Sequence, residues 1–245
     1  MDTDVVSRIG ERRYRLIKLW VNDVNGAFDA LYAGAIGPAT SVLDAGASRG
    51  DPDLPSIHHG AMSVACDADE LGLRGNSLFR HRVLNVLNAL PFRNEAFDVI
   101  VCKFVVEHLT DPVAVFREFC RVLRPGGVVA ILTPNKNSLF AVIARLWPYR
   151  LKQLFKRFLF GGHDEDTFPA HYRANTPSAI TGAMHAAGFQ RQRLDMIGGM
   201  WAFFIFNGPL ALAVRALERV QMRTPLLRGT CTHMMGLWTK PAPAA

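Results

Sequence analysis

The sequence predicts an α/β fold, in which helices cover both faces of a doubly wound, mostly parallel sheet of seven strands. The first observation is that short apolar runs alternate with helical segments from residue 40 to residue 135. Strands that alternate with helices pair in parallel through right-handed crossovers. The second observation is that an acid followed by small residues ends the first run, at Asp44. Open α/β sheets bind their ligands outside the carboxyl ends of the strands.

The composition fits one such domain with insertions. The chain has 245 residues, of which 49% are hydrophobic, and a formal net charge of +7. This length suits one α/β domain better than two. The basic balance favours an anionic partner, although an ordinary basic surface is an equal alternative. The four cysteines stand singly, and residues 1–4 do not resemble a signal peptide, so we expect a cytoplasmic location without disulfides.

Residues 1–39 are predicted to form a helical cap before the sheet. Apolar residues recur at three- and four-residue steps between residues 7 and 35, which gives one apolar face. The first half of this helix carries five cations: Arg8, Arg12, Arg13, Arg15 and Lys18. The cap can cover a cofactor or touch an anionic substrate, and a solvated helix face is the alternative.

The first two predicted strands each end at an acid. Residues 40–43 form the first strand and lead into the turn from Asp44 to Gly50, whose small residues let backbone amides approach a ligand. Residues 61–66 form the second strand and end at Asp67. The spacing of the two acids fits a strand–turn–helix–strand unit that brings an acid opposite a ribose. We therefore expect Asp67 to bind ribose hydroxyls, with a surface turn acid as the alternative.

The remaining elements are predicted from apolar runs and from their stop signals. The third strand is placed at 82–87, the fourth at 97–102, the fifth at 128–133, the sixth at 189–197 and an antiparallel last strand at 233–238. Pro112 opens a helix over 113–123, because proline in a first turn leaves no needed amide unpaired. Residues 124–127, Arg-Pro-Gly-Gly, are expected to stop that helix.

Four motifs in this region resemble class I S-adenosylmethionine-dependent methyltransferases of the type 11 branch. They are Phe-Asp-Val-Ile at 97–100, Val-Glu-His-Leu-Thr-Asp-Pro at 106–112, Arg-Val-Leu-Arg-Pro-Gly-Gly at 121–127 and Leu-Thr-Pro-Asn at 132–135. The resemblance covers residues 41–135 closely and resumes weakly at 171–177 and 186–189. It implies a Rossmann-like methyltransferase fold and S-adenosylmethionine as the cofactor.

The resemblance also assigns cofactor contacts to residues of this chain. Around the methionine part and the ribose it implies Asp44, Gly46, Ala47, Gly50 and Asp67. Ser48 stands where the family has its middle glycine. Asn85 stands in the neighbourhood where the family has an acid that binds the adenine amino group, and its carbonyl can accept the same bond. The backbone amide of Val86 or Leu87 can serve the adenine ring, and the backbone at Lys103 is expected close to the cofactor.

Catalysis of methyl transfer requires little beyond alignment, because the sulfonium methyl is already electrophilic. A general base helps when the acceptor is a hydroxyl or an amine. His108, beside Glu107, is expected to face the site, and a histidine that only holds its loop is the alternative. His171 and Tyr172 are candidate substrate residues. No histidine–carboxylate spacing predicts a metal site.

Two insertions follow the cofactor-binding core of residues 40–135. Residues 136–176 are expected to form a lid or substrate insertion, whose basic, amphipathic middle at 145–160 can instead lie in a membrane interface. Residues 177–245 complete the sheet and contain an apolar helical insertion at 198–229. Residues 196–214 carry no charge, but the breaks at 198–199 and 207–209 argue against a membrane span.

The predicted function is methyl transfer to a small-molecule or lipid-linked acceptor. The alternative is a catalytically inactive cofactor- or ligand-binding protein of the same fold. A nicotinamide-dependent dehydrogenase would need Gly-x-Gly-x-x-Gly, which residues 46–50 do not supply. We do not expect a nucleic-acid partner, because the basic residues are interleaved with bulky aliphatic ones. Peripheral contact with the inner membrane surface stays open, and the sequence indicates no oligomeric state.

Overall fold

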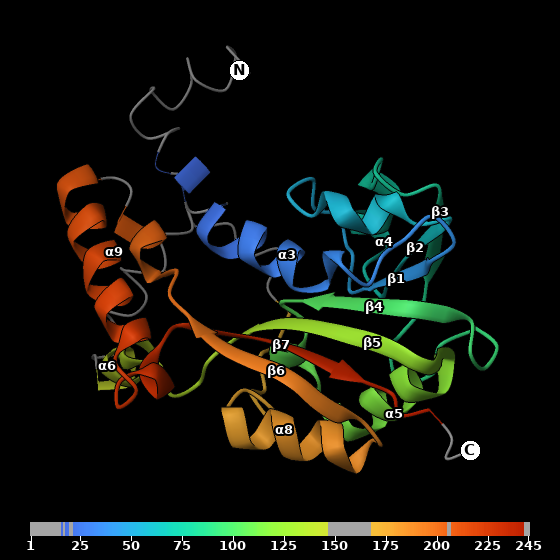
Figure 1. Ribbon diagram of the computed structural model, residues 1–245. Helices are drawn as coiled ribbons and strands as arrows, with labels where there is room; N and C mark the ends of the chain where they lie inside the picture. The colour runs from blue at the N-terminus through green and yellow to red at the C-terminus, as the bar shows by residue number, and fades with distance from the viewer. Residues whose placement is uncertain (1–15, 17, 20–21, 147–167, 205–206, 243–245) are drawn as a thin grey trace. The chain divides into compact units, whose positions relative to one another are not determined.

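The computed structural model contains a seven-stranded sheet in the order β3-β2-β1-β4-β5-β7-β6 (Figure 1). It describes residues 16, 18–19, 22–146, 168–204 and 207–242. The strands are β1 (Ser41–Ala45), β2 (Met62–Asp67), β3 (His81–Leu84), β4 (Phe97–Lys103), β5 (Leu123–Pro134), β6 (Gln190–Ile197) and β7 (His233–Thr239). The pairs β1–β2, β2–β3, β1–β4 and β4–β5 are parallel. The predicted α/β fold class is confirmed.

The strand order reverses at β1, which pairs with β2 on one side and with β4 on the other. In the register of these pairs, Asp44 lies opposite Ala65 of β2 and opposite Val101 of β4. A reversal of this kind leaves a crevice outside the carboxyl ends of the strands. Asp44 therefore lies at the place where an open α/β sheet binds its ligand.

The described residues fall into two compact units. The sheet unit comprises Asn25–Pro134, Ala170–Asp195 and Met234–Ala245, and the helical unit comprises Met1–Val24, Asn135–Pro169 and Met196–His233. Fully buried side chains of the sheet unit include Leu43, Ile100 and Phe116. Leu16, Trp201 and Ala211 form a separate buried cluster in the helical unit. The single domain expected over 1–245 stays a prediction.

The helices divide between these units. The sheet unit holds η1 (Asn22–Gly26) in part, α3 (Ala27–Ala33), η2 (Pro55–His59), α4 (Glu70–Gly75), η3 (Val106–His108), α5 (Pro112–Val122) and α8 (Pro177–Ala186). The helical unit holds α6 (Leu139–Leu146), η4 (Met200–Phe204), α9 (Gly208–Arg223) and η5 (Arg228–Thr230). Within the sheet unit, α3 and α4 lie on one side of the sheet, and α5 and α8 on the other (Figure 1). No described helix is long and apolar enough to cross a membrane.

Three helices begin with a polar cap followed by proline. The side chains of Asp111, Thr176 and Asn207 each accept a hydrogen bond from the amide three residues later, at 3.1, 3.2 and 3.2 Å. These bonds satisfy amides that have no partner inside the helix. Proline follows each cap within two residues, where its missing amide costs nothing. The sequence therefore fixes where α5, α8 and α9 begin.

Several predicted boundaries were wrong. The third strand ends at Leu84 and does not continue to residue 87. Between the first two strands the chain forms the short 3-10 helix η2, because Pro52 and Pro55 lack the amides that an α-helix needs. The helix ends before residues 124–127 as expected, but the fifth strand begins at Leu123, directly after α5, and not at residue 128. Gly127 permits this close entry, since a Cβ there would lie 2.7 Å from the carbonyl oxygen of Asp98.

The predicted helical cap is described only in part. Residues 22–33 contain one π-helical turn, η1, followed by α3, in place of one continuous helix. Of the five basic residues in the first half of the predicted cap, only Lys18 lies within the described residues. The part of the predicted lid from residue 147 to residue 167 also lies outside them. At the other end of the chain, Lys240 accepts a hydrogen bond from Gly126 and donates one to Gly127. Exchange of this kind is typical of antiparallel strands, as expected for β7 beside β5.

Candidate functional site

The turn after β1 folds back over the end of β2. The amides of Gly46 and Ala47 both donate to the carbonyl oxygen of Cys66, at 2.8 and 3.3 Å. Gly46 has a φ of 87°, and a Cβ there would lie 2.1 Å from Cγ2 of Val105. Gly50 has a φ of 79°. Both glycines occupy left-handed backbone that other residues adopt only with strain, so the turn is shaped by the absence of side chains.

Ser48 takes the conformation that glycine would supply at its position. Its φ is 38°, in the left-handed region. Its amide donates to Oδ2 of Asp67 at 2.8 Å, and its hydroxyl donates to Oδ2 of Asp69 at 3.2 Å. These two bonds offset part of the strain that a left-handed serine carries. The replacement of the middle glycine therefore leaves the turn formed.

Asp67, at the end of β2, is bonded to the turn that follows β1. Its Oδ2 accepts from the amide of Ser48 and its Oδ1 from the amide of Asp69, both at 2.8 Å. Each carboxylate oxygen can accept two hydrogen bonds. Asp67 is thus fixed in orientation by the backbone and keeps acceptor capacity on both oxygens. This is the arrangement that recognition of two vicinal hydroxyls requires.

Asp44 is buried in an acidic cluster with one cation. Its side chain is only 5% exposed. Burial, together with repulsion from Asp51 and Asp67, raises its pKa to about 7 against the opposing effect of Lys103. The ammonium group of Lys103 pairs with Oδ2 of Asp51 and lies 5.4 Å from the ring centroid of Phe104. The crevice therefore contains more carboxylates than cations, which suits a positively charged ligand.

Lys103 contributes its side chain to this site and not only its backbone. The sequence predicted only that the backbone there approaches the cofactor, whereas the side chain joins the acidic cluster through Asp51. Sequence reasoning did not select Asp51, although it follows the glycine turn directly. An acid at that position is a signal that could have been used. Phe104, next to Lys103, has a φ of 55°, and such strain is frequent at functional sites.

The predicted adenine side lies just beyond the short third strand. The amide of Asn85 donates to the carbonyl of Asp67 at 2.9 Å, which places Asn85 at the same edge as the two acids. Oδ1 of Asn85 accepts from the amide of Val86 at 2.7 Å. The Val86 amide that was expected to serve the adenine ring is therefore paired with Asn85. The Val86 side chain is 51% exposed, so this corner is open to a ligand.

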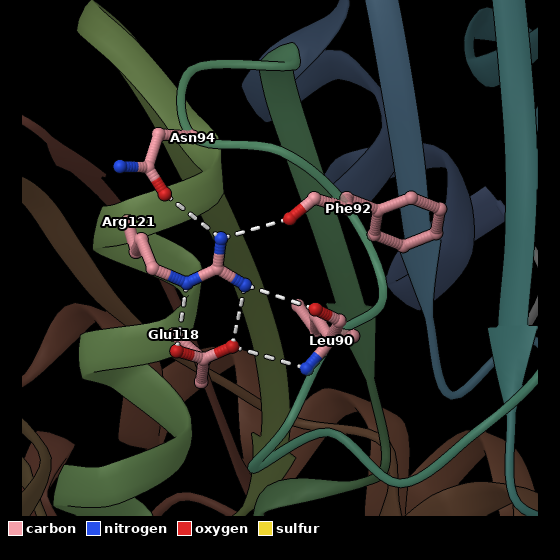
Figure 2. Close-up of polar contacts among 5 residues, drawn as sticks. All are labelled: Leu90, Phe92, Asn94, Glu118 and Arg121. Atoms are coloured by element: carbon pink, nitrogen blue, oxygen red, sulfur yellow. Dashed lines mark hydrogen bonds and ion pairs between the residues drawn. The ribbon is translucent and has the colours of Figure 1, made fainter.

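Arg121 of α5 holds the segment that follows this corner (Figure 2). Its guanidinium donates five hydrogen bonds, two of them to Glu118 at 2.9 and 2.7 Å. The others reach the carbonyls of Leu90 and Phe92 and the side chain of Asn94, at 2.9, 2.8 and 2.9 Å. All five donors of the guanidinium are thus used, which a lysine could not reproduce. The role of Arg121 was not foreseen, although it begins one of the quoted motifs.

Glu107 lies inside the sheet unit and holds the predicted substrate residues. Its carboxylate accepts from the hydroxyl of Thr133 at 3.0 Å, and burial raises its pKa above the usual value. Its carbonyl oxygen accepts from the amides of His171 and Tyr172, at 2.7 and 3.0 Å. Tyr172 has a φ of 52°. The structure therefore brings Glu107 together with residues 171–172, which are distant in the sequence.

Asn175 is a third residue that sequence reasoning missed. It is fully buried, and its Nδ2 donates to Oγ1 of Thr133 at 2.7 Å and to the carbonyl of Pro134 at 3.1 Å. A chain of hydrogen bonds therefore runs from Asn175 through Thr133 to Glu107. The quoted motif at 171–177 contains Asn175, and a polar residue directly before a helix cap and proline was the available signal.

His108, the predicted base, is the last residue of η3 and is half-buried. Its amide donates to the carbonyl of Val105 at 2.9 Å, which fixes the backbone of the turn after β4. Within the described ranges, no three histidine, cysteine, aspartate or glutamate side chains are grouped so as to hold a metal ion.

Comparison with known families gives one match within this chain. The family model described as "Methyltransferase domain" matches residues 43–131. This range contains the glycine turn, both acids, Lys103 and Arg121.

Curated relatives extend the similarity over different lengths. A demethylmenaquinone methyltransferase of Mycolicibacterium paratuberculosis is 27% identical over 214 residues, which cover 84% of this chain and 88% of the relative. A ubiquinone biosynthesis O-methyltransferase of Parvibaculum lavamentivorans is 30% identical over 51% of this chain and 54% of its own length. The chain spans 46% of an uncharacterised protein of Mycobacterium tuberculosis that is 31% identical, so it matches about half the length of several relatives.

Solved structures share the fold. An S-adenosylmethionine-dependent methyltransferase from Mesorhizobium loti superposes with a TM-score of 0.60 at 16% identity, over 89% of this chain and 99% of that one. A geranyl diphosphate C-methyltransferase from Streptomyces coelicolor, bound to S-adenosyl-L-homocysteine, gives a TM-score of 0.56 at 14% identity over 88% and 78%. At these identities the likeness concerns the fold.

Proposed function

We propose a function from the premise that residues 43–131 of this chain belong to the class I S-adenosylmethionine-dependent methyltransferases of the type 11 branch. The proposed reaction is transfer of a methyl group from S-adenosylmethionine to a small-molecule or lipid-linked acceptor. The observation that carries this proposal is the hydrogen bond between the Ser48 amide and Asp67, which joins the glycine turn to the acid of β2. The site so formed has two features that suit this cofactor: a tight turn that the positive φ angles of Gly46 and Gly50 permit, and a cluster of carboxylates that includes the buried Asp44.

The charge of the crevice supports a sulfonium cofactor. Burial raises the pKa of Asp44, and repulsion from Asp51 and Asp67 adds to this shift. A ligand that carries positive charge relieves this repulsion when it binds, because opposite charge favours the ionised carboxylate. A pyrophosphate ligand such as a nicotinamide dinucleotide would add negative charge to the same place. The crevice therefore favours S-adenosylmethionine over a dinucleotide.

The residues of this chain are assigned separate tasks in methyl transfer. When bound, S-adenosylmethionine supplies an electrophilic methyl group. Asp44 and the turn residues Gly46, Ala47 and Gly50 hold its methionine part, and Asp67 accepts from its ribose hydroxyls. Asn85 is assigned to the adenine side. These contacts fix the direction of the methyl group, and alignment is the main requirement of the reaction.

On the acceptor side, we assign Glu107 to positioning and His108 to proton removal. The backbone carbonyl oxygen of Glu107 holds the loop that carries His171 and Tyr172, and the bond from Thr133 to its carboxylate fixes the Glu107 side chain. His108 follows it in the turn after β4 and can accept a proton from a hydroxyl or amine acceptor.

The acceptor that fits best is a lipid-linked quinone or its precursor. Two relatives are named for demethylmenaquinone methylation and for ubiquinone biosynthesis. The insertion at 136–176, which follows β5, is rich in apolar and basic residues and suits an apolar acceptor. This acceptor class is inferred from those names and from composition.

A labelled transfer assay tests the proposed function. The full chain is incubated with S-adenosylmethionine that carries a labelled methyl group, and with phenolic or quinol acceptors that carry prenyl tails of increasing length. We expect label in the acceptor, more of it as the tail lengthens, and less with an Asp67→Ala variant at a subsaturating cofactor concentration. Cofactor binding without label in any acceptor or membrane-lipid extract would contradict the proposal and favour a non-catalytic binding protein.

A further inference from the structure

We propose that the outer face of α9 docks on an anionic membrane surface. We define this outer face by four apolar and two basic side chains of α9: Leu210, Leu212, Leu217, Val220, Arg219 and Arg223. The proposal concerns the helical unit alone and is independent of the proposed methyl transfer.

The two sides of α9 differ in burial. Ala211 and Glu218 are 0% and 2% exposed, whereas Leu212, Leu217 and Val220 are 47, 63 and 58% exposed. With 3.6 residues per turn, Ala211 and Glu218 lie on one side of the helix, and the three exposed apolar residues point to the other sides. Exposed apolar surface costs about 25 cal/mol for each Å². A leucine face of this kind in water indicates a partner.

The turn after α9 continues this apolar surface. Leu226 and Leu227 are 91% and 43% exposed, and they follow Pro225 directly. Arg228 donates from Nε to the carbonyl of Met222 at 2.7 Å, which folds this turn against the end of α9. The turn therefore adds two exposed apolar side chains, Leu226 and Leu227, at the end of α9.

The acidic residue of α9 lies on its buried side, and two of its basic residues lie on its exposed side. Glu218 is the only acid between residues 208 and 228, and it points inward, where the amides of Gly199 and Met200 donate to its Oε1 at 3.0 and 2.9 Å. Arg215 is half-buried and pairs with Asp23 at 2.5 and 2.7 Å. Arg219 and Arg223 remain on the exposed side. The outer face thus presents cations and apolar groups without any acid.

This combination matches an anionic lipid surface. Apolar side chains can enter the boundary between headgroups and acyl chains, while arginines bind lipid phosphates. The helix has 16 residues, which at 1.5 Å each gives about 24 Å, less than the roughly 30 Å of a hydrocarbon core. It therefore lies in the plane of the interface. A second copy of the same face would bring like charges together, so self-association through it is disfavoured.

Vesicle co-sedimentation of the full chain tests this proposal. We expect binding to phosphatidylcholine vesicles that contain phosphatidylglycerol, weak binding to pure phosphatidylcholine, and loss of binding at high salt, because salt screens the arginines. Leu217→Glu should weaken binding at least about tenfold. Leu71→Glu is the matched control, because Leu71 is 75% exposed on α4 of the sheet unit, and it should leave vesicle binding unchanged.

A second set of variants tests the role of the two arginines. Unlike Leu217→Glu, these variants introduce no negative charge on the outer face. Arg219→Gln with Arg223→Gln should reduce binding to anionic vesicles severalfold, whereas the control pair Arg117→Gln with Arg191→Gln, exposed on α5 and β6, should not. Unfolding temperatures are compared to exclude misfolding. Equal binding to neutral vesicles, no binding to anionic ones, or a dimer that Leu217→Glu dissociates would overturn the proposal. Methyl transfer is not measured, so failure here leaves the proposed function untouched.

Discussion

The amide of Ser48 donates to Oδ2 of Asp67 across 2.8 Å, and this bond joins the turn after β1 to the end of β2. Asp44 and Asp67 lie at the same end of these two paired strands. Burial is the main cause of the raised pKa of Asp44, and repulsion from Asp51 and Asp67 contributes to it. The proposed cofactor site depends on this relationship, because separate surfaces could not hold the sugar and the amino-acid part of one molecule.

Replacement of Asp67 tests the ribose contact. Asp67→Ala should weaken binding of S-adenosylmethionine by roughly 1–3 kcal/mol, since hydrogen bonds to a charged acceptor are lost. The fold should also lose some stability, because the amides of Ser48 and Asp69 lose their acceptor. Calorimetric titration measures the affinity. Glu70→Ala is the control, since Glu70 is an exposed acid nearby, paired with Arg74; equal affinities for both variants would mean that Asp67 does not contact the cofactor.

Asp44 should make cofactor binding depend on pH. Its pKa is raised to about 7, so much of it is protonated in slightly acidic buffer, and a cationic ligand prefers the ionised form. Affinity should therefore rise as pH increases towards 7, by up to about tenfold per pH unit, and then level off. Asp44→Asn should bind more weakly and lose this dependence. A wild-type affinity that stays constant between about pH 5.5 and 7.5 would contradict the assignment.

Asp44 should also make the stability of the ligand-free protein depend on pH. Stability should fall as pH rises, whereas cofactor affinity rises. A pKa that is raised in the folded state gives stability that is present below the unfolded value of 3.8 and lost as pH rises through about 7. The ligand-free protein should therefore lose up to about 4 kcal/mol relative to Asp44→Asn between about pH 4 and 8. Denaturant unfolding of both proteins measures this difference. If the unmodified protein instead gained stability relative to Asp44→Asn as pH rises, Asp44 would be stabilised as a carboxylate.

The shape of the glycine turn can be tested through Val105. Gly46→Ala should lower the free energy of unfolding by about 2–4 kcal/mol, because it combines a positive φ with a Cβ that would lie 2.1 Å from Val105. Gly126→Ala is the matched control, since Gly126 has a φ of 80° and no atom within 4 Å of such a Cβ. It should cost only about 1 kcal/mol. Val105→Ala should recover part of the loss in Gly46→Ala, and equal losses for both glycines would exclude the steric explanation.

The separate roles of His108 and Glu107 predict different kinetics. His108→Ala should reduce kcat by about 100-fold or more if it removes the acceptor proton, with little change in cofactor affinity. Glu107→Gln should retain activity, because its amide oxygen can still accept from Thr133. Single-turnover transfer measures both. Full turnover by His108→Ala would leave His108 as a residue that only holds its loop.

The sheet and its acids could be predicted because they follow from local patterns. Continuous apolar runs such as 97–102 and the acid-then-small-residue turn at Asp44 each depend on neighbouring residues only. Helix starts such as Asp111-Pro112 are also local. The fold class, the strand positions and the shared edge of Asp44 and Asp67 could therefore be predicted from the sequence.

The rest depended on contacts between distant segments. Three of the five bonds of Arg121 reach a loop 27 to 31 residues earlier, and Asn175 bonds to Thr133 across 42 positions. The pairing of Lys103 with Asp51 likewise spans 52 positions. No periodicity indicates such partners. The length of the third strand was also misjudged, since its pairing with β2 ends at Leu84.

Calorimetric titration of the full, unmodified chain with S-adenosylmethionine is the most direct test of the central claim, which is that the crevice beside Asp44 and Asp67 holds this cofactor. We predict saturable binding at one site per chain, competition by S-adenosyl-L-homocysteine and no competition by a nicotinamide dinucleotide. Absence of binding by both sulfur compounds, in a protein that unfolds cooperatively, would contradict the account.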